Sequence, residues 1–461
     1  MRGEAPRARP RRSRPLGRGL HVTTGSRRAD GPTHSPPRAA HPRDPVAVRA
    51  RHRGCLWELV LRLRALALAL SLGALAACTA PPTLGEIGSD EQAATDDETS
   101  PKGGSRASDA NSPEATSSAK GLLDARRLDL GEVGDGDEVT VDVGGDDVGF
   151  VVTATGPSGL GIVRVTSPSK RVVFDGFTKV GTTQATGRAQ GGTASIAVPS
   201  TSEATTRIER GAWKVTFAGA GTGTAHARVQ VAPGGTFVGA VLDLHLWIPD
   251  GLRISGPSPE HAVVAARAAS DTDLRARVDA FFEALETVTG IERGDVTFHA
   301  APAELRLLDT DAKLERAGAL PPAGANGQAL HVVVTNDILN GAAMGFSPGM
   351  PGAVGLGGTA ASAIFAAHLE GVDARTDALT WFHEMGHFVG LHHTSELDGA
   401  MFDPLSDTPR CPGQRTQSTR CPDEGNLMFT GAFAPVPRLS ASQLAILRAS
   451  PISRAKAAPG R

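Results

Sequence analysis

Tyrosine is absent from this chain of 461 residues, and aromatic residues of all kinds make up only 4% of it. No phenol group can therefore take part in a catalytic mechanism here. Long apolar runs are also scarce. Residues 65–77 form an apolar stretch, but a transmembrane helix needs about 20 residues. Charged residues make up 21%, near the usual fraction for a soluble protein, and the length allows two or three domains with buried cores.

Charge is unevenly distributed along the chain. Residues 1–77 contain 16 arginines and four acidic residues, a net charge of +12, whereas the whole chain has a formal net charge of −2. The remainder therefore has a net charge of −14, which disfavours nucleic acid as a partner. The basic N-terminus alone could indicate a nucleic-acid-binding arm. It leads directly into an apolar stretch, however, which is the order of segments in an export signal.

The apolar stretch ends in Leu75-Ala76-Ala77-Cys78, which resembles the lipobox of bacterial lipoproteins. Small residues before a cysteine and a polar segment after it favour this interpretation over a buried apolar helix. We expect cleavage before Cys78, lipidation of that cysteine, and an exported protein that is anchored in the cell envelope or extracellular. The Arg- and Pro-rich residues 2–53 make the signal abnormally long, so we expect the start codon to be over-extended.

Two regions of different character follow the predicted signal at 1–77. Residues 78–120 consist mostly of Ser, Thr, Asp, Glu, Gly and Pro, which predicts a disordered tether. Residues 121–235 contain short alternating stretches between turn residues, which predicts an all-β sandwich. These stretches are 138–143, 161–165 and 213–217. The glycines at 156–161 would suit a phosphate loop, but no βαβ context surrounds them and turns need glycine anyway.

Residues 236–461 are predicted to form an α+β domain. An apolar face with helical spacing extends from Leu274 to Val288, and Gly290 ends the pattern. A second helix is expected to begin near Thr376, late in the order of elements. The strands expected around these helices are 240–248, 295–298, 330–334 and 363–365.

The second helix carries the strongest functional signal, His383-Glu384-Met385-Gly386-His387-Phe388-Val389-Gly390-Leu391-His392-His393. Residues four apart lie on the same face of a helix, so His383 and His387 can present two imidazoles to one metal ion. Glu384 lies beside them and can act as a general base. A catalytic zinc ion normally keeps three protein ligands and a water, so a third ligand is required.

His393 can supply that third ligand because Gly390 precedes it. A glycine three residues after His387 allows the backbone to leave the helix at positive φ. His393 can then turn under the metal, which a straight helix would not allow. The neighbouring His392 is one position short of this spacing, so we place it at the surface or in contact with a ligand.

The stretch matches the metzincin zinc-peptidase pattern His-Glu-x-x-His-x-x-Gly-x-x-His at every fixed position. The alternative, an amphipathic helix that holds histidines by coincidence, would have to explain five fixed residues at ligand spacing. Metzincins also place a methionine in a tight turn beneath the metal. Met401 and Met428 are the candidates, and Met428 fits the family's usual separation better.

Among the metzincins, residues 376–450 resemble the pappalysin family. The resemblance implies a metzincin-like catalytic domain with a mixed twisted sheet and one catalytic Zn²⁺. It also places Asp403 and Asp407 in a segment that binds Ca²⁺ in some relatives, although acidic loops are commonly just solvated. The residues that carry the resemblance are His393-Thr394, Asp403, Ser406-Asp407-Thr408-Pro409, Cys411, Cys421-Pro422, Asn426-Leu427-Met428 and a predicted closing helix at 440–450.

The remaining features concern the surroundings of the site. Cys411 and Cys421 are expected to pair in an exported protein. Thr430 stands where relatives often have a tyrosine that assists the transition state, so that assistance must be absent or replaced. Residues 429–436 contain no Asp or Glu, so a preference for basic residues after the cleaved bond is not carried over. By the likeness, residues 351–356 are the candidate edge strand for substrate.

These patterns predict a monomeric zinc endopeptidase that cleaves extracellular or surface proteins, with Glu384 as general base. One alternative is a surface adhesion or carbohydrate-binding lipoprotein with a vestigial peptidase domain. Intact ligands and an intact base argue against that decay. Another alternative is a narrow processing enzyme that trims one exported partner.

Overall fold

The computed structural model describes residues 124–156, 160–176, 192–200, 208–237, 239–256, 258–322, 328–368, 370–396, 399, 401–411, 421–431 and 436–454. The predicted signal, its cysteine Cys78 and the tether at 78–120 lie outside these residues. Contacts divide the chain into units 1–64 and 65–461, and all of the described structure belongs to the second unit. Within it, no helix is both long and apolar enough to cross a membrane.

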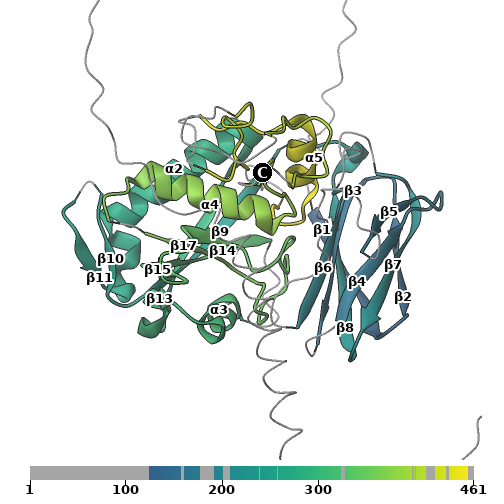
Figure 1. Ribbon diagram of the computed structural model, residues 1–461, viewed down its shortest axis with the longest axis horizontal. Helices are drawn as coiled ribbons and strands as arrows, with labels where there is room; N and C mark the ends of the chain where they lie inside the picture. Colours follow the sequence, from purple (N-terminus) through teal and green to yellow (C-terminus); the bar gives the residue numbers. More distant parts are fainter. Residues whose placement is uncertain are drawn as a thin grey trace, which may run out of the picture. The chain divides into compact units, whose positions relative to one another are not determined.

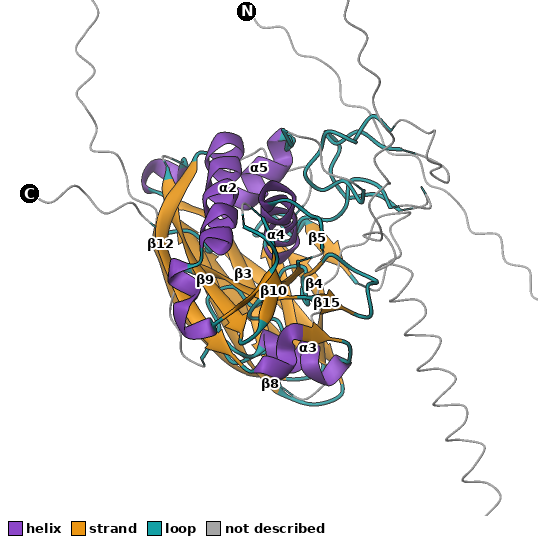
Figure 2. Cartoon of the chain, turned by 90° about the vertical axis from the view of Figure 1, so that its left-hand side faces the viewer, coloured by secondary structure: helices purple, strands orange, loops and turns teal. Residues whose placement is uncertain are grey.

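The described structure is mixed α/β, with several sheets and few helices (Figures 1 and 2). Its N-terminal part contains two four-stranded antiparallel sheets, ordered β1-β8-β3-β6 and β2-β7-β4-β5. Both sheets contribute side chains to one apolar core, for example Phe150 and Trp213. The strands are β1 (Asp124–Val133), β2 (Glu138–Val143), β3 (Asp147–Thr155), β4 (Leu160–Thr166), β5 (Val172–Asp175), β6 (Thr193–Val198), β7 (Gly211–Gly219) and β8 (Gly223–Val231).

A five-stranded sheet ordered β12-β9-β14-β17-β16 forms the centre of the C-terminal part. Its first four strands are parallel, and β16 is antiparallel at the edge. Helices α2 and α4 lie on one side of this sheet and α3 on the other (Figures 1 and 2). The elements are β9 (Ala240–Pro249), β12 (Ile291–Ala301), β14 (Ala329–Thr335), β16 (Gly345–Phe346), β17 (Ile364–Ala367), α2 (Thr272–Thr289), α3 (Asp311–Gly318), α4 (Ala374–Phe388) and α5 (Ala441–Ala449).

Short elements complete this part. Strand β10 pairs with β11, and β13 pairs with β15. Their bounds, with those of the 3₁₀ turns, are β10 (Leu252–Ile254), β11 (His261–Val263), β13 (Leu307–Leu308), β15 (Asp337–Ile338), η3 (Pro233–Gly235), η4 (Ala265–Ser270) and η5 (Ala303–Arg306).

Local capping signals fix the ends of the helices. The Asp271 side chain accepts hydrogen bonds from the first turn of α2, and Gly290 ends that helix at φ 73°, as predicted. Asp373 caps α4, which begins two residues before the predicted start at Thr376. Helix α5 confirms the predicted closing helix, and Ser440 with Gln443 forms its capping box.

The antiparallel sheets pack directly against the α/β part. Val151 of β3 and Ala197 of β6 belong to the same apolar cluster as the side chains beneath α4. Gly149 lies so close to helix α5 that a Cβ there would be 2.7 Å from the Ala449 carbonyl oxygen. Two side chains of the β1-β8-β3-β6 sheet therefore join the core of the α/β part, which is separate from the core between the two antiparallel sheets.

The segment 351–356 is part of this contact, which corrects the sequence-based prediction of an edge strand there. The Ser195 hydroxyl donates to the Pro351 carbonyl at 2.5 Å, and Arg228 donates to the Gly355 carbonyl at 3.0 Å. The segment lies in turns against β6 and β8, and the edge strands of the described five-stranded sheet are β12 and β16. Bonds to residues more than 100 positions away hold it there.

A buried charge network joins the two long helices. Arg277 of α2 donates to Asp377 of α4 at 2.6 Å, and both side chains are at most 3% exposed. His368 donates from Nδ1 to the same carboxylate oxygen at 2.8 Å, and its Nε2 accepts from the Ser255 backbone at 3.1 Å. The network fixes α4 six residues before His383.

Candidate metal centre

Three histidines converge at the C-terminal end of α4. His383 and His387 lie in its last turns, and His393 follows the turn after it; their exposed fractions are 2%, 7% and 9%. Gly390 adopts φ 105°, which confirms the predicted departure from the helix. The Leu391 amide then bonds back to the Gly386 carbonyl at 2.8 Å, which brings His393 toward the other two rings.

Hydrogen bonds to the outer ring nitrogens fix the tautomers. Nδ1 of His383 is 2.7 Å from the Leu427 carbonyl, and Nδ1 of His387 is 2.7 Å from the Leu391 carbonyl. Nδ1 of His393 is 3.0 Å from a carboxylate oxygen of Glu396. Each partner can only accept, so each Nδ1 carries the hydrogen and each neutral ring has its lone pair on Nε2.

The three Nε2 atoms face one another. Nε2 of His393 is 3.2 Å from that of His383 and 3.1 Å from that of His387. Burial lowers the pKa of His383 to about 3, and it lowers that of His387 well below the usual value, which favours the neutral form of these two rings. Nε2 lone pairs this close together repel one another, and a bound cation would relieve that repulsion. Zinc–nitrogen bonds of about 2.0–2.1 Å at tetrahedral angles would separate the nitrogens by about 3.3–3.4 Å. These residues form a possible metal-binding group, whereas His392 is outside it.

Glu384 is buried beside the triad and 2% exposed. A side chain at Gly345 of β16 would collide with its carboxylate, so the glycine makes the approach possible. Burial raises the pKa of Glu384 to about 8, partly offset by a hydrogen bond from the Ser347 backbone. An ion at the triad would favour the charged carboxylate and oppose this shift. Glu384 thus lies between the three nitrogens and the edge strand.

Met428 lies in a tight turn beneath α4, as predicted. The Phe429 amide bonds to the Asn426 carbonyl at 3.1 Å, which closes the turn. Met428 is fully buried, and its sulfur occupies the space that a side chain at Gly386 would need. The same turn supplies the Leu427 carbonyl that orients His383. Met401, the other candidate, lies in the separate segment that pairs with Glu396.

Glu396 was not singled out from the sequence, although it holds the ring of His393. A carboxylate behind a metal-binding histidine orients the ring and raises its basicity. We expect Glu396→Gln to weaken Zn²⁺ binding by about 10- to 100-fold, because the neutral amide stabilises the ring less. Competition with a fluorescent zinc chelator would measure this. Glu370→Gln, at an exposed position, is the control; equal affinity in the two variants would contradict the role of Glu396.

The other predicted site residues have separate places. Cys411 and Cys421 form the expected disulfide. Asp403 accepts from the Thr408 hydroxyl and the Leu405 amide, whereas Asp407 accepts from Ser440 and Ser442 at the start of α5. No third His, Cys, Asp or Glu of the described residues joins these two carboxylates in a ligand group. Calcium binding there stays a prediction.

A histidine cluster on the central sheet also escaped the sequence analysis. His245 of β9 stacks on His299 of β12 and His331 of β14, with ring centroids 5.1 and 4.7 Å away. Nδ1 of His331 accepts a hydrogen bond from the Trp247 indole at 3.2 Å. Burial lowers the pKa of His331 to about 3, and the neighbouring imidazoles add to the effect. His245 and Trp247 are two residues apart in β9, so strand alternation predicts that they lie on the same face of the sheet. That pattern could have indicated the cluster.

This cluster predicts acid sensitivity. The unfolded chain protonates His331 near pH 6.5, but the folded chain does so only near pH 3. The stability that depends on neutral His331 is therefore complete above pH 6.5 and is lost progressively as the pH falls toward 3. We expect His331→Gln to lose less stability than the wild type between pH 7 and 4.5, as judged from urea midpoints. Equal losses would contradict this assignment.

Comparisons with known proteins add little to this geometry. No protein-family model and no curated protein matches the chain. A Bacillus licheniformis lipase in its propeptide form is among the solved structures that match, at 17% identity and a TM-score of 0.15. The match covers 27% of this chain and only 24% of the lipase chain. A TM-score this low carries no argument about fold or activity, so the function has to be argued from the site.

Proposed function

We propose that this chain is a zinc-dependent endopeptidase with a metzincin-like catalytic domain, preceded by a β-sandwich domain made of the two antiparallel sheets. The observation that carries the proposal is the convergence of three imidazole Nε2 atoms, 3.1–3.2 Å from one another through His393, beside a buried carboxylate. The glycine turn at Gly390, the tight turn at Met428 and the antiparallel edge strand β16 support the same reading. The two turns are features that the resemblance to metzincins implied, whereas the edge strand it implied was 351–356 and not β16.

Zinc is the ion that suits this donor set best. Three imidazoles with an open fourth position are a common arrangement of catalytic zinc. His383, His387 and His393 would hold the ion. When bound, zinc supplies Lewis acidity, which lowers the pKa of water and polarises the scissile carbonyl.

Glu384 performs the proton transfers in this proposal. Its carboxylate takes a proton from the attacking water as the oxygen–carbon bond forms, and returns it to the amide nitrogen as the carbon–nitrogen bond breaks. The hydrogen bond from the Ser347 backbone orients the carboxylate. Because the chain has no tyrosine, stabilisation of the transition state cannot come from a phenol group.

The substrate is proposed to lie along β16. This strand pairs on one side with β17 and is the last strand of the described sheet. A peptide that extends the sheet there would form main-chain hydrogen bonds. It would pass Gly345, and therefore the carboxylate of Glu384. Recognition through the main chain fits an enzyme that tolerates many side chains.

Export is proposed from two features. The disulfide between Cys411 and Cys421 is the kind of bond that persists in an oxidising compartment. The predicted signal and lipobox at Cys78 precede the described residues. Mass spectrometry of the mature N-terminus is expected to find a lipid-modified Cys78; an intact Met1 would contradict it.

Cleavage of an unfolded protein such as casein tests the proposed function. We expect cleavage by the full chain to stop in the presence of a zinc chelator and to return when Zn²⁺ is added. His393→Gln should lose both bound zinc and activity, because two nitrogens do not complete the site. His392→Gln is the matched control, since it changes the adjacent histidine, and should retain both. Chelator-resistant cleavage, or equal effects of the two variants, would contradict the proposal.

A further inference from the structure

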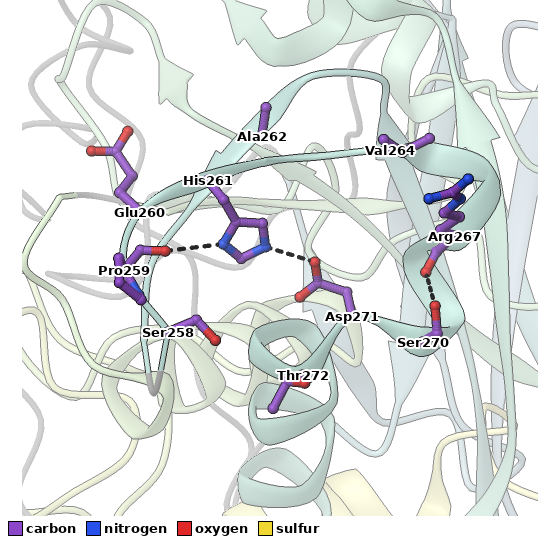
Figure 3. A pocket seen from close by; sticks show the side chains of 10 residues that line it. All are labelled: Ser258, Pro259, Glu260, His261, Ala262, Val264, Arg267, Ser270, Asp271 and Thr272. Carbon is purple, nitrogen blue, oxygen red and sulfur yellow. Dashed lines mark hydrogen bonds and ion pairs between the residues drawn. The ribbon is translucent and has the colours of Figure 1, made fainter.

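A second group of ligand side chains lies where the β10–β11 hairpin meets the start of α2. His261, Asp271 and Asp273 each offer one ligand atom, and these atoms lie within 4.8 Å of one another. Figure 3 shows the His261 ring between the Pro259 carbonyl and the Asp271 carboxylate. None of the three takes part in the proposed peptidase chemistry.

Helix capping does not account for both carboxylates. Asp271 uses Oδ1 to cap α2, which leaves Oδ2 at 2.8 Å from Nε2 of His261. Asp273 uses Oδ1 to accept from the Ser258 amide at 3.1 Å. Its Oδ2 accepts no hydrogen bond from any described residue, although the side chain is 0% exposed. A buried carboxylate oxygen without a donor indicates a bound water or ion.

A proton on His261 does not satisfy that oxygen. Nδ1 of His261 is 3.6 Å from Oδ2 of Asp273, beyond hydrogen-bonding distance, and 3.1 Å from the Pro259 carbonyl. Even a doubly protonated ring would therefore donate to Asp271 and Pro259. The hydrogen bond to Asp271 raises the pKa of His261, so an incoming ion has to displace that proton to solvent.

We propose that His261, Asp271 and Asp273 bind one divalent transition-metal ion. Asp271 is 2.8 Å from Nε2 of His261 and Asp273 is 3.6 Å from Nδ1, and only one ring nitrogen can bind the ion. One ligand atom from each residue lies within 4.8 Å of the others, so side-chain rotation has to bring them to bonds of about 2.0–2.2 Å. A nitrogen donor disfavours Ca²⁺ and Mg²⁺, which prefer oxygen. A surface cavity of about 570 Å³ borders the group (Figure 3) and has room for water molecules as further ligands.

The ion would connect the hairpin to the helix. His261 belongs to β11, whereas Asp271 is the N-cap of α2 and Asp273 lies in its first turn. Helix α2 in turn contacts α4 through the buried network of Arg277 and Asp377. The ion would be structural. It would add to the three hydrogen bonds that join the hairpin to α2, which are those of His261 with Asp271, Ser258 with Asp273 and Ser255 with Arg277.

Counting bound ions tests the inference. The full chain, stripped with a chelator and dialysed against Zn²⁺, is expected to hold two ions. His261→Gln and Asp273→Asn should each hold one. His226→Gln is the matched control, because His226 is also 2.8 Å from a carboxylate, that of Asp129, but belongs to no ligand group. It should hold two.

The two proposals fail in different ways. A single ion that His393→Gln loses and His261→Gln retains would overturn this inference and leave the peptidase proposal intact. A single ion that His261→Gln loses and His393→Gln retains would support this inference and contradict the peptidase site.

Hydrogen exchange supplies a second readout. Zn²⁺ should slow exchange in the hairpin at 252–263 at least tenfold in the wild type and in His393→Gln, and not in His261→Gln. If Zn²⁺ does not slow exchange in the wild-type hairpin, the proposal that an ion connects the hairpin to α2 is overturned.

Discussion

Glu384→Gln is expected to lower the rate of casein cleavage by about 10²- to 10⁴-fold, the usual contribution of a general base. The substitution preserves the size of the side chain and its contact with Gly345 but removes the group that accepts the proton. Zinc should stay bound, because the Nδ1 partners of the three histidines are Leu427, Leu391 and Glu396, and none of them changes. The rate should therefore fall at unchanged zinc content.

Rates and zinc content have to be measured on the same samples. Glu286→Gln, on the exposed surface of α2, is the matched control for loss of one carboxylate and should cleave at the wild-type rate. Wild-type cleavage by a zinc-loaded Glu384→Gln protein would rule out the general-base role. Loss of zinc from that protein would instead assign Glu384 to the structure of the site.

Arg277→Met is expected to destabilise the protein by about 3–5 kcal/mol, because it leaves a buried carboxylate without its cation. Arg277 is fully buried and donates to Asp377 at 2.6 Å. It also donates to the backbone carbonyls of Asp273 and Ser255, so one side chain holds three segments. The urea midpoint measures the loss. Since α4 carries two of the three histidines, zinc affinity should fall with it.

Two further variants separate burial from charge. Arg316→Met breaks an ion pair with Glu304 that has the same 2.6 Å separation but lies on the surface, and it should leave the urea midpoint unchanged. Arg277→Met with Asp377→Leu removes both charges and should be less destabilised than Arg277→Met alone. A double variant as unstable as the sum of its single variants would contradict the ion-pair explanation.

The features that could be predicted from the sequence are those with local causes. The spacing of His383, His387 and His393 around Gly390 encodes the tripod within eleven residues, because helix periodicity and one left-handed glycine are enough to bring the rings together. The end of α2 at Gly290 and the start of α5 at Ser440 have equally local signals.

The features that could not be predicted depend on distant partners. Arg277, His368 and Asp377 come from parts of the chain up to 100 residues apart, and no local pattern indicates that they meet. Residues 351–356 have the composition of a turn-rich segment. Only their hydrogen bonds to Ser195 and Arg228 show why they do not form a strand of the central sheet. Glu396 is close to His393 in sequence, but its role requires the direction of the imidazole to be known.

The apolar cluster that Val151 and Ala197 share with the side chains beneath α4 bears on how the proposed peptidase could be kept latent. A zymogen is usually activated by releasing a segment that the mature enzyme does not need. Cutting the chain near residue 235 and removing the antiparallel sheets would take Val151 and Ala197 out of this cluster. It would also remove the hydrogen bonds to 351–356 and the close contact of Gly149 with α5. We therefore expect the sheets to remain attached to the proposed catalytic domain, so that a removable inhibitor would be another segment of the chain or a separate protein.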